Sequence, residues 1–321
     1  MDFFKDLNIK YQLTNKRLYS GRESENSNQY WHEKITFSDI TTIENSTKKQ
    51  FGILGYACDE GVKRNQGRVG AKKGPEFIRQ KLGKLPIHFT HKKVTDFGDI
   101  TCIDENLEDC QAAFSKSISH LITHNIFPIG IGGGHDIAYA TFNGIKGALT
   151  NDQKNKIGII NFDAHFDLRV IDRQPNSGTP FNQILSENDN VVYFPVGIQQ
   201  QSNTKELFEI AKQKNISFLT NFDCETFSDS VKCNLNSVLE KVDHLYITID
   251  LDGFSSAFAP GVSAASPLGL SPNFIYQALT FLLKSNKVIA CDITELNPKY
   301  DKDNITAQLA AKLIDYIVLQ A

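Results

Sequence analysis

The sequence predicts an α/β fold in which helices cover both faces of a mostly parallel β-sheet. Two observations lead to this prediction. From Phe51 onwards, short apolar runs rich in β-branched residues recur along the chain, and helix-like stretches lie between them. Strands and helices alternate in this way in sheets built from βαβ units. Such sheets place an active site beyond the carboxyl ends of the strands.

Six apolar runs are expected to form buried strands, because each is short and rich in branched or aromatic residues. They cover residues 51–57, 125–133, 156–164, 191–198, 244–252 and 287–296. Helices are expected over residues 107–124, 204–215, 271–285 and 304–320. Ser271 followed by Pro272 is a favourable helix start, since serine caps the first turn and proline suits its first position.

The chain is expected to form one domain with an N-terminal extension. Residues 1–50 are polar, rich in Asn, Ser, Thr and Lys, and show no sustained periodicity. Residues 51–321 contain no internal repeat and no Pro/Gly/Ser linker, so they are interpreted as a single catalytic domain. The extension is expected to pack on this domain or to contribute to an oligomer contact.

Composition excludes several classes of protein. The 34 Lys and Arg residues nearly balance the 37 Asp and Glu residues, and the net charge is -3. No long run of one sign occurs, so binding to nucleic acid is not expected. No apolar stretch reaches about 18 residues, so neither a membrane span nor a signal peptide is expected. The protein is therefore expected to be cytoplasmic. The six cysteines include no Cys-x-x-Cys pair, and reduced thiols are expected.

Acidic residues and histidines follow four of the predicted strands. They are His135, Asp163, His165, Asp167, Asp250, Asp252 and Glu295. Alternate residues of an extended chain point the same way, so the side chains of each cluster should project to one side. A single Asp-x-Asp at a strand end is usually a turn or a helix cap, and a single buried histidine is usually a hydrogen-bonded core residue. Several clusters beyond strands of one sheet make a shared site the better interpretation.

Carboxylates gathered in one place need cations, because unpaired buried charges are costly. Two divalent metal ions would neutralise them. Oxygen and imidazole ligands without thiolates favour a hard ion such as Mn²⁺ over structural Zn²⁺. The sequence therefore predicts a site for two Mn²⁺ ions.

Four segments resemble the signature blocks of the ureohydrolase family, which includes arginases and agmatinases. They are GGGHD at 132–136, DAHFD at 163–167, ITIDLDGF at 247–254 and DITELNP at 292–298. The resemblance implies a three-layer α/β/α sandwich whose mostly parallel sheet has about eight strands, two Mn²⁺ ions bridged by a hydroxide, and a homo-oligomer, commonly a trimer or hexamer. It also implies that His135 and Asp167 bind one ion, that His165 and Asp252 bind the other, and that Asp163 and Asp250 bridge both.

Within this family the chain most resembles the formimidoylglutamase branch. Residues 64–79 and 167–185 carry this closer likeness. It implies hydrolysis of a small molecule, N-formimidoyl-L-glutamate, to L-glutamate and formamide, a reaction of histidine degradation. Agmatinases typically have a histidine immediately before the GTPF motif, and arginases have one at the matching place, where it assists proton transfer. Ser177 holds this position here, and no histidine occurs between His165 and His244.

Such a substrate has a cationic amidine and two carboxylates, so its site should combine an acid with arginines. Glu295 is expected to anchor the amidine nitrogens, and Asp167 to orient the attacking hydroxide. Arg169 and Arg68 are expected to bind carboxylates, because guanidinium groups match them bidentately. Asn65 and Ser177 are further candidates for substrate contact.

Two alternatives remain open from the sequence. One is a ureohydrolase that releases urea from agmatine or a guanidino acid such as guanidinobutyrate. The other, from a different class, is a metal-bound protein that binds its ligand without catalysis.

Overall fold

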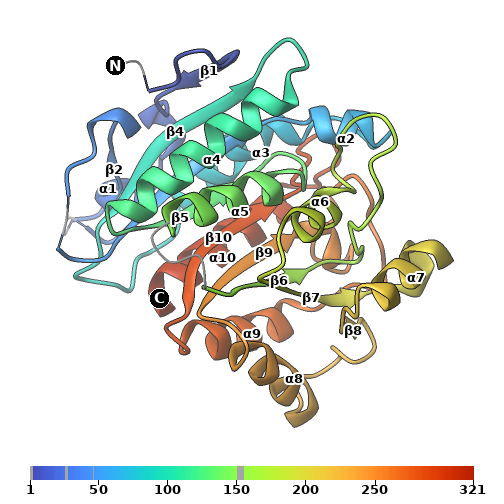
Figure 1. Ribbon diagram of the computed structural model, residues 1–321. Helices are drawn as coiled ribbons and strands as arrows, with labels where there is room; N and C mark the ends of the chain where they lie inside the picture. The colour runs from blue at the N-terminus through green and yellow to red at the C-terminus, as the bar shows by residue number, and fades with distance from the viewer. Residues whose placement is uncertain (1–2, 26–27, 46, 150–154) are drawn as a thin grey trace.

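The computed structural model describes residues 3–25, 28–45, 47–149 and 155–321. Its centre is a sheet that, in this part of the chain, has ten strands (Figure 1). The strands are β1 (Ile9–Gln12), β2 (Thr36–Phe37), β3 (Gln50–Ala57), β4 (Val94–Cys102), β5 (Ile126–Ile131), β6 (Ile157–Phe162), β7 (Val191–Ile198), β8 (Leu219–Thr220), β9 (His244–Asp250) and β10 (Val288–Thr294). The order across the sheet is β1-β4-β3-β5-β10-β9-β6-β7-β8, and β2 pairs with β4 beside this path.

The sheet is mostly parallel, as predicted. The pairing of β1 with β4 is antiparallel, whereas the other described pairings of named strands are parallel. The eight strands from β3 to β10 correspond to the expected number of about eight, and β1 and β2 add two strands at one side. Strands buried on both faces read as continuous apolar runs, and this is why six of them were visible in the sequence.

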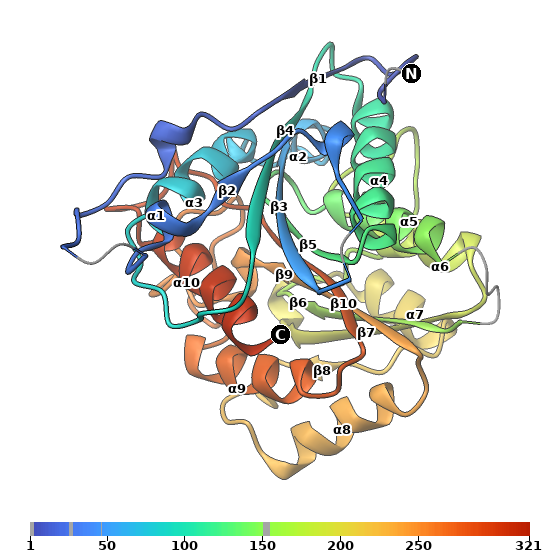
Figure 2. The ribbon, with the colours of Figure 1, turned by 90° about the vertical axis from the view of Figure 1, so that its left-hand side faces the viewer.

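Helices form a layer on each face of the sheet. The helices are α1 (Trp31–Lys34), α2 (Glu60–Arg64), α3 (Gly74–Leu82), α4 (Leu107–Thr123), α5 (Ile137–Ala148), α6 (Pro180–Glu187), α7 (Lys205–Gln213), α8 (Asp229–Leu239), α9 (Pro272–Leu283) and α10 (Ile305–Gln320). Apolar side chains of α3, α8, α9 and α10 pack in one core cluster, and those of α4, α5, α6 and α7 pack in another. Figure 2 shows the sheet between α3, α9 and α10 on one side and α4 and α5 on the other. The three-layer sandwich is confirmed.

The four predicted helices agree with α4, α7, α9 and α10 to within a few residues. Ser271 caps α9 as expected, because its hydroxyl accepts a hydrogen bond from the backbone N–H of Phe274 at 3.2 Å. Among the described residues, no helix has the length and apolar character needed to cross a bilayer.

The described residues before β3 include strands and helices of the same sandwich. Strand β1 extends the sheet beyond β4, and Trp31 is buried with its indole N–H donating to Asp315 at 2.7 Å. Asp315 belongs to α10, so α1 packs beside α10, whereas Phe3, Phe4 and Leu7 pack on the other face with the cluster of α4 and α5.

Candidate binuclear metal centre

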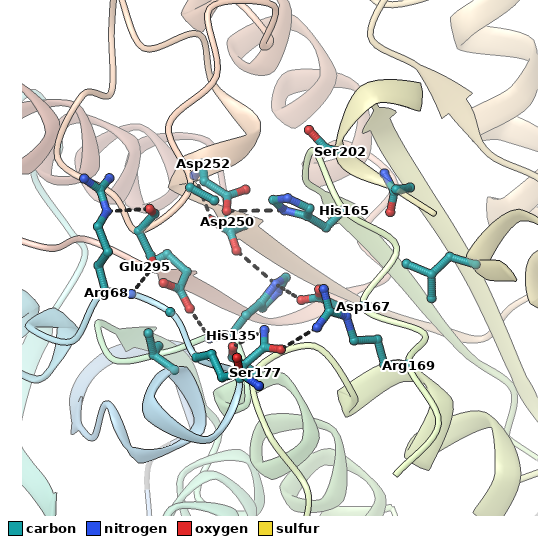
Figure 3. Close-up of a pocket in the computed structure, with 18 residues that line it drawn as sticks. Arg68, His135, His165, Asp167, Arg169, Ser177, Ser202, Asp250, Asp252 and Glu295 are labelled. Carbon is teal, nitrogen blue, oxygen red and sulfur yellow. Dashed lines mark hydrogen bonds and ion pairs between the residues drawn. The ribbon is translucent and has the colours of Figure 1, made fainter. Parts of the chain in front are cut away.

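Four neighbouring strands, β5, β10, β9 and β6, bring the predicted site residues together. All four run parallel, so their carboxyl ends share one edge of the sheet. His135 follows β5, the Asp163–Asp167 segment follows β6, Asp250 ends β9, and Glu295 follows β10. The side chains of His135, His165, Asp167, Asp250, Asp252 and Glu295 point toward one another in Figure 3. The structure therefore brings these residues together beyond the carboxyl ends of the strands.

Two groups of possible metal ligands share Asp163. In the first group, the Nδ1 atom of His135 lies 3.1 Å from an oxygen of Asp163, 3.0 Å from Asp167 and 3.1 Å from Asp250. In the second group, Nδ1 of His165 lies 3.4 Å from the other oxygen of Asp163 and 3.3 Å from Asp252. The sequence-predicted ligands thus form two adjacent clusters, and the two oxygens of Asp163 face different clusters.

The donor set fits divalent cations. Ligands at right angles on an ion with bonds of about 2.1 Å lie about 3 Å apart, which is close to the separations around His135. In the described part of the chain, Nδ1 of His135 and one oxygen of Asp252 are buried and have no hydrogen-bond partner. Buried polar atoms are normally paired, so these two atoms are available to a metal ion. Imidazole and carboxylate ligands are those that hard and borderline divalent ions accept.

The charge of the site also calls for cations. Burial and the neighbouring carboxylates raise the pKa of Asp250 well above its usual value. Burial would lower the pKa of His135, yet the aspartates around it raise that pKa well above the usual range. Protons on these groups would supply the positive charge that metal ions provide. Burial also raises the pKa of Glu295 to about 8.

The backbone of the site departs from common conformations. Asp167 and Glu295 have φ angles of 45° and 66°, in the left-handed region that non-glycine residues rarely adopt. Such conformations persist where the surrounding structure holds them, and they are frequent at functional sites. Gly133 has a φ of +72°, and a Cβ there would lie 2.5 Å from the ring of Tyr56. The glycine run therefore lets the chain turn tightly before His135.

Two residues behind the metal ligands were missed by the sequence analysis. His135 contacts the hydroxyl of Thr248 through Nε2 at 3.0 Å, and Thr248 is paired with Asp292 across strands β9 and β10. Asp292 also accepts hydrogen bonds from Thr141, at 2.8 Å, and from Tyr246. Polar residues inside the apolar runs at 244–252 and 287–296 are the signal that could have identified Thr248 and Asp292.

A cavity of about 290 Å³ opens above the ligand clusters. Its wall includes Glu295 and the substrate-contact candidates Asn65, Arg68, Arg169 and Ser177. One oxygen of Glu295 accepts the backbone N–H of His135 at 2.8 Å, which fixes the carboxylate beside the metal ligands. A cavity of this size suits a small molecule. Ser202, Asn203 and Ala264 also line it and were not predicted.

Three of the substrate-contact candidates form a hydrogen-bonded chain. Arg169 donates to the side-chain oxygen of Asn65 at 2.8 Å, and the Asn65 amide donates to the hydroxyl of Ser177 at 3.1 Å. Ser177 is buried, whereas Arg169 is exposed. The Arg169 guanidinium is therefore held beside the cavity while part of it faces solvent.

Arg68 is held by its own surroundings. Its guanidinium donates to the carbonyl oxygens of Ser263 at 2.7 Å and Val262 at 2.6 Å. It also stacks on Tyr300, with 3.9 Å between the guanidinium carbon and the ring centroid. These contacts leave Arg68 fewer free donors than Arg169 for a carboxylate ligand.

Comparisons with known proteins show the family of the chain. The sequence model of the Arginase family matches residues 49–320. A curated formimidoylglutamase from Clostridium tetani is 39% identical over 97% of this chain and 96% of its own length. One from Legionella pneumophila (strain Philadelphia 1) is 40% identical over 97% of this chain and 98% of its own length.

Solved structures share the fold. The crystal structure of formimidoylglutamase from Bacillus subtilis has a TM-score of 0.80 at 23% identity, over 93% of this chain and 95% of that one. The structure of Trypanosoma cruzi formiminoglutamase with Mn²⁺ has a TM-score of 0.76 at 24% identity, over 88% of this chain and 98% of that one. From the match over residues 49–320 and the identity along nearly the whole length, the chain belongs to the arginase family.

Proposed function

We propose that this protein hydrolyses N-formimidoyl-L-glutamate to L-glutamate and formamide. The observation that carries the proposal is one small cavity with a buried acid, Glu295, beside the metal-ligand clusters and an exposed cation, Arg169, on its wall. This arrangement complements a substrate with an amidine at one end and carboxylates at the other. The curated relatives named formimidoylglutamase support the same substrate.

Two Mn²⁺ ions are the proposed cofactors. His135 and Asp167 would hold one ion, His165 and Asp252 the other, and Asp163 and Asp250 both. The two ligand clusters support this assignment for all six residues except that Asp250 lies in the first cluster only. The Mn²⁺ named for the Trypanosoma cruzi structure supports the choice of metal. When bound, the ions lower the pKa of water toward neutrality and add positive charge where negative charge develops on the substrate.

Asp167 and Glu295 are the proposed catalytic residues. The Asp167 side chain is 13% exposed and faces the cavity, so its carboxylate can accept a hydrogen bond from the attacking hydroxide and orient it. Glu295 would accept hydrogen bonds from the amidine nitrogens and hold the formimidoyl carbon in line for attack. A cationic amidine would keep the Glu295 carboxylate ionised despite a pKa raised by burial to about 8.

The departing amine of glutamate needs a proton. In the described cavity wall the histidines are His135 and His165, both proposed metal ligands. Asp167 is therefore the proposed route for the proton, because its carboxylate lines the cavity and would accept a hydrogen bond from the hydroxide before attack.

Arg169 is the proposed anchor for the substrate carboxylate. Asn65 holds one of its nitrogens, and the remaining donors are free to form a bidentate pair. Replacing Arg169 with Met should raise KM about ten- to hundredfold, as expected for loss of a charged hydrogen bond. Exposed Arg22 provides a matched control, since Arg22→Met removes the same group outside the cavity.

Product analysis tests the function. Purified, Mn²⁺-loaded protein is incubated separately with formimidoylglutamate, agmatine, guanidinobutyrate and arginine. Formamide and glutamate from the first substrate alone are expected. Urea from any of the others would contradict the proposed substrate, although the protein would still be a hydrolase. Binding of metal and formimidoylglutamate without any product would favour a ligand-binding protein instead.

A homo-oligomer also remains part of the proposal, because trimers and hexamers are common among the proteins that the sequence resembles. Light scattering coupled to size-exclusion chromatography measures the mass in solution. A mass equal to that of one chain would contradict the proposed homo-oligomer.

A further inference from the structure

Three cysteine side chains from separate elements meet at the edge of the sheet. Cys58 directly follows β3, Cys102 ends β4, and Cys110 lies in α4. The three thiols lie close enough to affect one another's pKa, and Cys58 and Cys102 line the same surface cavity. All three are free thiols, and none is among the proposed metal ligands or cavity-lining residues of the active site.

The three thiols differ in access to solvent. Cys58 and Cys110 are buried, whereas Cys102 is partly exposed. Cys58 and Cys102 both line a surface cavity of about 360 Å³. The charged residues on its wall are Lys63, Lys72 and Lys299 together with Asp59, Glu60, Asp104 and Glu105. A small polar oxidant can therefore reach Cys102, and Cys58 lies beside it.

Cys102 has the character of a reactive thiolate. Hydrogen bonds from Cys110 and Cys58, with help from the charge of Arg64, lower the pKa of Cys102 to about 4. The same contacts and burial raise the pKa of Cys58 well above its usual value. Thiols that sense oxidants are typically ionised, accessible and next to a second cysteine.

We propose that Cys102 is a peroxide-reactive site and that Cys58 resolves it, so that oxidation closes a Cys58–Cys102 disulfide across the ends of β3 and β4. The Cys102 thiolate attacks one peroxide oxygen, the O–O bond breaks, and a sulfenic acid and hydroxide form. The Cys58 sulfur then attacks the Cys102 sulfur, and the sulfenic hydroxyl leaves with the Cys58 proton as water. Two electrons pass from the sulfurs to the peroxide.

The register of the sheet favours Cys58 over Cys110 as the partner. Ala57 and Thr101 are paired across the parallel strands β3 and β4. Cys58 and Cys102 are the next residues along these two strands, so they are neighbours as well. Neighbouring strands lie about 4.8 Å apart. This separation falls within the Cα range of about 4.4 to 6.8 Å that a disulfide spans.

The disulfide would act on the active site through the backbone. The carbonyl oxygen of Cys58 accepts the N–H of Gly134 at 3.0 Å, and Gly134 directly precedes His135. Pulling Cys58 toward β4 therefore strains the loop that positions a proposed metal ligand. We expect the oxidised protein to lose activity at least about fivefold, a change of about 1 kcal/mol, and to regain it on reduction.

Mass spectrometry tests the site without relying on activity. The wild-type chain is treated with low hydrogen peroxide, alkylated and digested, with and without dithiothreitol. A reversible disulfide between the peptides that contain Cys58 and Cys102 is expected. Cys233, which is exposed on α8, is the internal control, and Cys102 should react with iodoacetamide at about pH 6 at least about tenfold faster.

Three variants separate the roles of the cysteines. Cys102→Ser should abolish the disulfide and make activity resistant to peroxide. Cys58→Ser should leave a sulfenic acid on Cys102 that a 1,3-diketone probe traps. Cys110→Ser should retain the disulfide. Slower reaction of Cys102 than of Cys233, or a disulfide between Cys102 and Cys110, would overturn the proposed site. Full activity of the disulfide form would overturn its coupling to the His135 loop.

Discussion

Thr248 holds the His135 imidazole from behind, through the 3.0 Å contact with Nε2. A hydrogen bond on the far nitrogen fixes which nitrogen of a histidine faces the metal. Thr248→Val keeps the shape of the side chain and removes the hydroxyl, so metal affinity should fall by about ten- to hundredfold. Titration of Mn²⁺ measures this loss, and activity should recover at excess metal. Thr248→Ser keeps the hydroxyl and serves as the control; equal loss in both variants would mean that packing, not the hydrogen bond, is responsible.

Asp163 and Asp250 provide a second test at the scale of single residues. If each carboxylate binds both ions, Asp250→Asn or Asp163→Asn should lower the metal content below that of the wild-type protein as well as the turnover. Elemental analysis of the purified variants measures bound Mn²⁺. Asp189→Asn, at an exposed position, should retain both metal and activity. An Asp250→Asn variant that keeps the full metal content would refute the bridging role of Asp250.

The sequence was informative about site residues that follow strands and less so about those within them. His135, Asp163, His165, Asp167, Asp250, Asp252 and Glu295 stand at strand ends, and the structure brings them together. Thr248 and Asp292 lie inside strands, where an isolated polar residue reads as a minor interruption of an apolar run. Whether the guanidinium of an arginine is free depends on tertiary contacts, so the carbonyls that hold Arg68 could not be foreseen.

Helix α3 and strand β4 are joined by a buried ion network. Arg79 is fully buried and donates to Asp96 at 2.7 Å and to Asp99 at 2.6 Å. Arg79→Met would leave the buried Asp96 and the partly exposed Asp99 without their cation, so the free energy of unfolding should fall by about 3 to 5 kcal/mol. Denaturant unfolding measures the change. Lys84→Met, just beyond α3 and exposed, should change stability by less than about 0.5 kcal/mol; a similarly small effect of Arg79→Met would show that the network contributes little.

The same network explains why β4 was absent from the predicted strands. Asp96, Gly98 and Asp99 break the apolar pattern of Val94–Cys102, although most of this strand is buried. Asp96 and Asp99 can lie in this strand because Arg79, from helix α3, neutralises their carboxylates. The strands that were predicted are those in which apolar residues dominate the run, such as Ile126–Ile131 and Ile157–Phe162.

The whole molecule does not divide sharply at residue 50. The Arginase family match begins at residue 49, near the proposed boundary, whereas β1 and β2 continue the sheet across it. The polar composition of residues 1–50 did not predict these strands. In β1, half-buried residues alternate with exposed ones, and β2 has two residues only. A single catalytic domain from residue 51 with an extension packed on it remains our proposal.

Metal binding should set the pH dependence of stability for the whole molecule. Without metal, Asp250 and Asp252 have raised pKa values in the folded state, chiefly because they are buried, and so does His135 because of its aspartate neighbours. The folded chain then binds more protons than the unfolded chain, and stability falls as pH rises through the raised pKa values.

Mn²⁺ should reverse this trend, because it takes the place of those protons. The difference in Tm between Mn²⁺-loaded and chelator-treated protein should therefore widen from about pH 6 to about pH 8. Differential scanning calorimetry at several pH values measures it, with Ca²⁺ in place of Mn²⁺ as a control for ionic strength. A Tm difference that narrows with rising pH would contradict the raised pKa values assigned to Asp250, Asp252 and His135.

Strand β10 lies at the centre of the sheet and near the end of the chain. It alone joins β5 to β9 along the described strand order, so β4-β3-β5 and β9-β6-β7-β8 have no shared ladder until Val288–Thr294 is in place. Proteins fold from the N-terminus as they are synthesised. On the ribosome, the nascent chain should therefore hold two separate half-sheets with exposed edges until β10 emerges from the exit tunnel. Until then, chaperones that shield exposed strand edges can bind the nascent chain.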